Sequence, residues 1–240
     1  MGLTIQATEF IIDKLIILIT YFTVIPIIGC FRAWVAEKMG DDTPERMGFL
    51  TLNPLVHISY FWLLLMIIDI VPFGFGRYIP LDPERFYSPF RALVAYLSDA
   101  FANILMALAA LFCFVLFFGS DPLSFFLNFS HAHAAAMYPG YENTSSFAVV
   151  IALFLRNIVF FNSMLAAFNI IVNLFYAAFF YFYSRKQGRS FALGGDHMQW
   201  VMIVGPVIFL ILFVNVIRVS ILYAIITIGM WFWQLISLLL

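Results

Sequence analysis

Long apolar runs separated by short polar stretches dominate the chain. About 20 apolar residues are needed to cross the hydrocarbon core of a bilayer. Four runs meet this length or approach it, and a further apolar tail follows Arg218; the runs are residues 10–31, 93–118, 158–183 and 200–217, and the tail is 219–240. The pattern predicts an all-α, polytopic membrane protein with four to six transmembrane helices. We expect one integral membrane domain over residues 1–240, with its core at about 10–217.

One apolar stretch is too short to cross. Residues 59–71 contain 13 residues and include Asp69, and Pro72 follows directly. Lys and Arg gather in the loops before and after this stretch and near residue 186, while residues 119–145 contain none. By the positive-inside rule both flanking loops are cytoplasmic. A segment with two cytoplasmic flanks does not cross once, so we predict a re-entrant or interfacial hairpin, with the N-terminus on the far side.

The composition narrows the class of protein further. Hydrophobic residues make up 64% of the chain, and 12 basic residues against 13 acidic ones give a net charge of -1. A soluble domain is about half apolar, so an ordinary soluble globule is excluded. Nucleic-acid binding is not expected either, because the chain has no basic field. Membrane lipid is the first predicted partner.

Two stretches carry a family resemblance. Residues 40–58, which read Gly-Asp-Asp-Thr-Pro-Glu-Arg-Met-Gly-Phe-Leu-Thr-Leu-Asn-Pro-Leu-Val-His-Ile, resemble the segment after the catalytic helix of the site-2 proteases, which are intramembrane zinc metalloproteases. The similarity continues through residues 72–86 and reaches Asn103, which resembles the end of a Gly-Pro-x-x-Asn motif. The likeness is greatest to the small bacterial members. It implies a site-2-protease-like core in a bacterial cytoplasmic membrane.

The resemblance also locates where the catalytic residues should be. The family holds one zinc with a His-Glu-x-x-His motif and a later Asp, because residues four apart share a helix face and the Glu between them acts as base. Matching the motifs puts the first His, the Glu and the second His at Ile28, Gly29 and Arg32. Counting from Asn169 puts the zinc-binding Asp at Ala177. We therefore predict a catalytically inactive relative with no metal cofactor, and we identify no small-molecule substrate.

Histidines elsewhere are the remaining candidates for a zinc site. The chain contains His57, His131, His133 and His197. We interpret His57 as a turn or hairpin residue and His131 and His133 as solvated loop residues. His197 is interpreted as a capping residue before the last span. An alternative function is a residual intramembrane metalloprotease that uses unrecognised ligands among them.

Polar residues at bilayer depth are functional candidates by default. Those singled out are Asp69, Asp99, Asn103 and Asn169. The two acids suggest a second alternative, a small ion- or proton-conducting transporter component. The predicted function remains a non-catalytic structural or regulatory subunit of a larger membrane complex, with other integral membrane subunits as partners.

Overall fold

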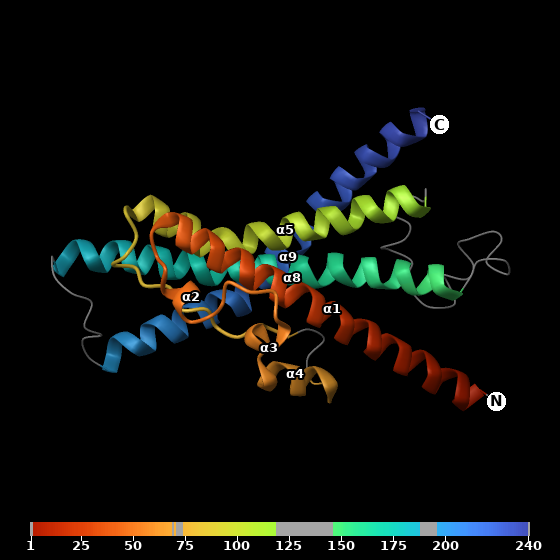
Figure 1. The fold of residues 1–240 in the computed structure, drawn as a ribbon, viewed down its shortest axis with the longest axis horizontal. Helices are drawn as coiled ribbons and strands as arrows, with labels where there is room; N and C mark the ends of the chain where they lie inside the picture. Colours follow the sequence, from red (N-terminus) through yellow and green to blue (C-terminus); the bar gives the residue numbers. More distant parts are fainter. Residues whose placement is uncertain (1, 69, 71–73, 119–145, 188–195, 240) are drawn as a thin grey trace.

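The computed structural model describes the backbone of residues 2–68, 70, 74–118, 146–187 and 196–239. Within these ranges it describes the side chains of residues 10–68, 70, 74–118, 147, 148, 150–177, 216, 217 and 219–238. The elements are helices (Figure 1), namely α1 (Gly2–Met39), α2 (Thr43–Arg46), α3 (Pro54–His57), α4 (Tyr60–Ile67), α5 (Pro89–Phe118), α8 (Ser146–Gln187) and α9 (Asp196–Leu239).

Four of the described helices are long and apolar enough to cross a membrane. Their candidate spans are Phe10–Met39, Pro89–Phe118, Val150–Ala177 and Val219–Leu238. The prediction of an all-α polytopic membrane protein is confirmed. Helix α5 packs along α8, and α1 and α9 pack against both of them, so the core lies among these helices.

The polar residues inside the long apolar regions do not interrupt the helices. Arg218 seemed to divide the run at 200–217 from the tail, but α9 continues through it. Likewise α8 continues through Arg156 and begins at Ser146, well before the expected start of its span at residue 158. Arginine favours the helix, and neither glycine nor proline stands beside these two residues to stop it.

The short apolar stretch returns to its starting point. Ile58 and Gly76 form an antiparallel bridge. The hydroxyl of Tyr21, in the first span, donates to the carbonyl of Phe75 at 2.9 Å and accepts from the amide of Ser59 at 3.2 Å. Both ends of the stretch are therefore fixed to one point on α1, as a hairpin requires.

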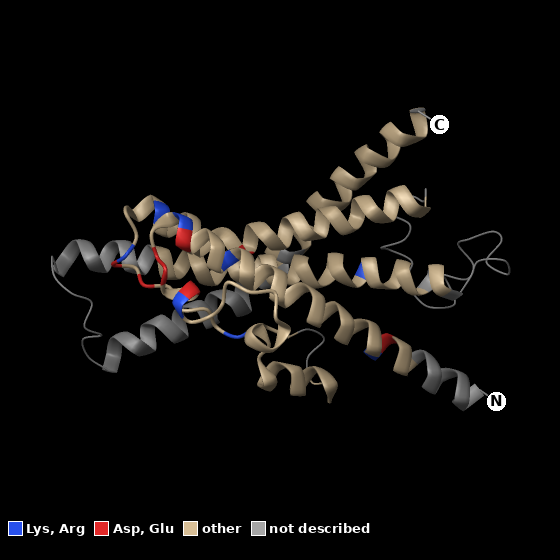
Figure 2. Cartoon of the chain, in the orientation of Figure 1, with Lys and Arg blue, Asp and Glu red and all other residues tan. Residues whose placement is uncertain are grey.

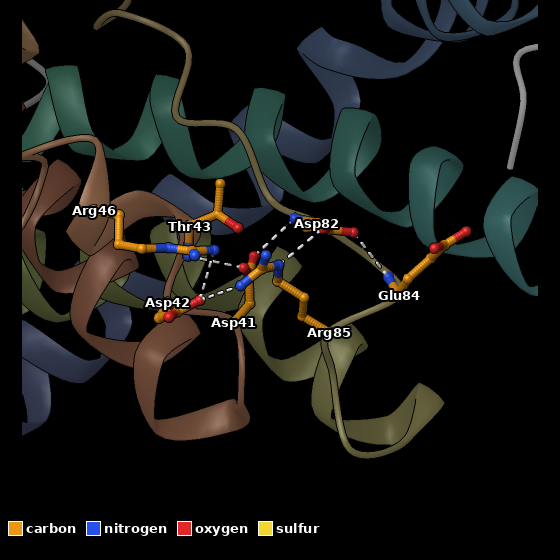
Figure 3. A network of polar contacts seen from close by, with 7 residues as sticks. All are labelled: Asp41, Asp42, Thr43, Arg46, Asp82, Glu84 and Arg85. Carbon is orange, nitrogen blue, oxygen red and sulfur yellow. Dashed lines mark hydrogen bonds and ion pairs between the residues drawn. The ribbon is translucent and has the colours of Figure 1, made fainter. Parts of the chain in front are cut away.

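A polar network joins the loop after α1 to the loop before α5 (Figure 3). The buried carboxylate of Asp41 accepts hydrogen bonds from the backbone amides of Thr43 at 3.0 Å and Asp82 at 2.7 Å. The guanidinium of Arg85 pairs with Asp42 at 2.6 Å and with Asp82 at 3.0 Å. Both loops therefore lie at the same end of the bundle, where Figure 2 shows most of the charged residues drawn in colour.

Replacing Asp41 tests this loop connection. In Asp41→Ala two backbone amides lose their acceptor, and each unsatisfied buried group costs about 1 to 3 kcal/mol. We expect a loss of roughly 2 kcal/mol or more, measured by thermal unfolding in detergent. Asp42→Ala is the matched control and should lose less, because its ion pairs are half exposed. Equal losses in the two variants would contradict this account.

Candidate functional site

A buried polar cluster connects three helices. Arg32 of α1 forms an ion pair with Asp99 of α5, and the two side chains are only 11% and 7% exposed. The side-chain amide of Asn173, on α8, donates to the other carboxylate oxygen of Asp99 at 2.9 Å. Asn103, one turn along α5, donates to the backbone carbonyl of Asp99 at 2.7 Å. The cluster thus brings one degenerate zinc-site position together with two of the predicted polar candidates.

Because the ion pair is buried, each of its two charges depends on the presence of the other. Removing a charged group from water costs several kcal/mol, and the attraction between partners offsets this only where both are present and well hydrogen-bonded. Inside a membrane protein such residues face the bundle interior and pair with each other. The carboxylate of Asp99 therefore needs Arg32, and the contact fixes α1 against α5.

His57 occupies the space beside Gly29. Its ring is 1% exposed, and Nε2 lies 2.7 Å from the carbonyl oxygen of Thr51. A carbonyl only accepts, so Nε2 is the donor and Nδ1 is left unprotonated in the neutral ring. A Cβ atom on Gly29 would lie 2.2 Å from Nδ1. The imidazole therefore fills the place where a side chain at position 29 would start.

The environment of His57 also favours its neutral form. Burial lowers the pKa of the His57 imidazole, an effect that the hydrogen bond to Thr51 opposes. Within the described part of the chain Nδ1 has no hydrogen-bond partner. The lowered pKa favours the uncharged ring at neutral pH.

A cavity of about 290 Å³ lies between α1, α8 and the hairpin. Ile28, Gly29 and Arg32 line one side of it, and Asn169 and Asp99 line others. Segments far apart in the sequence, all singled out as candidate site positions, thus face one cavity. Most of the remaining wall is apolar or aromatic.

The position matched to the third zinc ligand lies elsewhere. Ala177 packs against the small cluster around Ala36 and Tyr96 and is not among the cavity-lining residues. Asn173, one turn earlier, does line the cavity and bonds Asp99. Asn173 was not among the predicted site residues. Its four-residue spacing from Asn169 was the available signal, because both then lie on one face of α8.

Several predicted candidates fall outside the described residues. Asp69, His131 and His133 lie there altogether, and His197 lies in the first turn of α9 without a described side chain. The hypotheses that depend on them remain predictions.

The residues at the matched zinc positions do not fit zinc. Ile28 and Gly29 offer no side-chain ligand atom, and the guanidinium of Arg32 stays protonated and only donates. The described residues also contain no group of three His, Cys, Asp or Glu side chains arranged to hold a metal ion. A second cation beside Arg32 would be repelled by it.

A comparison with curated proteins finds one partial match. Over 98 residues the chain is 34% identical to the "Putative zinc metalloprotease YwhC" of Bacillus subtilis (strain 168). This stretch is 40% of the chain and spans 44% of the length of that relative. No protein-family model and no solved structure matches the chain.

Proposed function

We propose that the chain is a non-catalytic relative of the site-2 proteases and serves as a structural or regulatory subunit of a membrane protein complex in a bacterial cytoplasmic membrane. The observation that carries the proposal is the content of the matched catalytic positions. Arg32 is bound to Asp99, and Gly29 is covered by the ring of His57. These positions serve packing, so restoring a zinc site for proteolysis would require more than one substitution.

Similarity to a protease alone does not carry the activity across. The same fold hosts different functions, and function resides in the site. The local identity to the Bacillus subtilis relative supports a shared ancestry of the scaffold. The replaced ligands and base support the loss of its chemistry in this chain.

The least buried span supports a partner in the membrane. Only 17% of the apolar window in Val219–Leu238 is buried, against 39% to 56% in the other three candidate spans. The exposed large side chains on this span include Tyr223, Trp231 and Leu238. Lipid or a neighbouring transmembrane subunit covers this face, and the proposed role requires a subunit.

Purification from native membranes in mild detergent tests the proposal. We expect a co-purifying integral membrane protein and less than stoichiometric zinc by elemental analysis. Trp231→Ala with Leu235→Ala should weaken the association, whereas Phe101→Ala with Leu105→Ala removes exposed side chains of α5 as a matched control. A stable, partner-free monomer would remove the main support for the subunit role. One zinc per chain that disappears in His57→Ala would favour the residual metalloprotease instead.

The transport alternative depends on two acids, and the described contacts explain the burial of one of them. The ion pair with Arg32 explains why Asp99 is buried without requiring a proton path. Asp69 lies outside the described residues. If changing both acids to Asn leaves ion flux in proteoliposomes at the wild-type level, the transporter alternative fails.

A further inference from the structure

The cavity has the lining of an amphiphile site. Its volume of about 290 Å³ is at the lower end of ligand pockets. Ile25, Trp62, Phe75, Leu165 and Phe168 form apolar walls, and the polar lining residues include Arg32 and Arg77. Hydrocarbon in the cavity would contact these walls, while a polar group would need to lie near the arginines.

Arg77 is the arginine available to a ligand. Its side chain is exposed and its guanidinium lies 5.6 Å from the ring centroid of Phe49. Arg32, by contrast, is already paired with Asp99. No carboxylate of the described residues lies within ion-pair distance of Arg77, so its exposed guanidinium can pair with an anionic group of another molecule.

The cavity meets α1 near the end of the apolar run 10–31 and within the candidate span Phe10–Met39. The apolar run of α1 ends near residue 31, and the cavity contacts this helix at Ile25, Ile28 and Arg32. Gly76, the residue before Arg77, approaches Ile25 so closely that a Cβ atom on it would lie 2.8 Å from the Ile25 side chain. The aromatic residues Trp62 and Tyr78 also line the cavity, and such residues favour the membrane interface.

We propose that this cavity binds an acyl-chain amphiphile with an anionic head group, its chain against the Trp62 and Phe168 walls and its head group near Arg77. A phospholipid and a free fatty acid share this chemistry. Basic pockets between transmembrane helices on the cytoplasmic side suit such head groups. The inference goes beyond the subunit role, because it requires neither a protein partner nor a lost protease.

Photolabelling of the full chain in phosphatidylcholine vesicles tests the site. The probes are phosphatidylglycerol and phosphatidylcholine, each with a diazirine in one acyl chain, and diazirine-labelled palmitate. Mass spectrometry then maps the labelled peptides. We expect an anionic probe to label the peptides around Trp62 or Phe168 more strongly than phosphatidylcholine does. Labelling by phosphatidylglycerol or by palmitate identifies the source, and either supports the site.

Two variants separate a specific site from general lipid contact. Arg77→Gln should lower anionic labelling about fivefold, because a basic residue near an anionic lipid contributes about 1 kcal/mol. Arg91→Gln is the control and should leave labelling unchanged, because Arg91 lies over the ring of Tyr87 and does not line the cavity. Val172→Phe should remove the cavity labelling by filling space, and thermal unfolding of each variant verifies folding.

Three results would overturn the inference. These are equal cavity labelling by phosphatidylcholine and the anionic probes, labelling confined to residues outside the cavity, and cross-linking of the cavity to a co-purified protein instead of lipid. The first comparison uses the unaltered chain, so it decides the matter even if Val172→Phe fails to fold.

Discussion

Replacing Arg32 with methionine should lower the free energy of unfolding by about 3 to 5 kcal/mol, the cost of leaving one partner of a buried ion pair alone. Methionine keeps the length of the apolar stem but removes the charge, so among the described residues Asp99 keeps only Asn173 as a side-chain donor in the bundle interior. For a chain of this size the loss corresponds to a fall in melting temperature of about 10 °C. Thermal unfolding in detergent measures it.

A second substitution shows whether the loss comes from the unpaired acid. Arg32→Met with Asp99→Leu removes both charges, and we expect it to regain most of the lost stability, since apolar replacement of a buried pair is often neutral or stabilising. Arg91→Met is the matched control, because Arg91 is exposed and contacts the ring of Tyr87. If Arg32→Met is no worse than this control, the ion pair does not hold α1 against α5.

The same experiment tests how α1 is held in the bundle under the proposal that this chain binds no zinc. In the family that the sequence resembles, one zinc ion connects the two motif-bearing helices. Here Arg32 reaches α5 through Asp99, and Asn173 extends the connection to α8. The guanidinium of Arg32 thus connects α1 to α5 through an ion pair. The bundle needs no external ion at this point if the pair contributes as much as we expect.

The sequence predicted the membrane class because span length and apolar composition are local properties. The hairpin was predictable for a related reason, since a run of 13 residues is too short to cross and basic residues flank it. The continuity of α9 through Arg218 was missed, because a charge was taken as a boundary although nothing beside it stops a helix.

The contacts of the candidate site were beyond the sequence. Arg32 and Asp99 are 67 residues apart, and each was singled out for a separate reason, one as a lost ligand and the other as an intramembrane acid. The contact between Gly29 and His57 depends on where the hairpin packs. Such pairings are set by the arrangement of helices, which no local pattern encodes. Ala177 is an example, because counting along the motif matched it to a zinc ligand, yet it does not line the cavity.

Adding a single methyl group at Gly29 should destabilise the protein by about 3 kcal/mol, at the upper end of the cost of overpacking a core. The Cβ atom of Gly29→Ala would lie 2.2 Å from Nδ1 of His57. His57 is 1% exposed and its Nε2 bonds the carbonyl of Thr51, so a shift of the ring into the adjoining cavity would break that bond. Either the ring leaves this position or α1 and the hairpin move apart, and thermal unfolding measures the cost.

A double-mutant cycle with His57→Ala decides whether the clash is the cause. His57→Ala alone should also destabilise, since it removes ring packing and the donor to Thr51. In the double variant the methyl group meets no ring. The loss of stability in the double variant should therefore be smaller than the sum of the two single losses by about 1 to 3 kcal/mol. Gly229→Ala is the control, because its Cβ would meet Leu111, and it should combine additively with His57→Ala. Additive losses at Gly29 as well would mean that the imidazole does not occupy the matched position of the catalytic base.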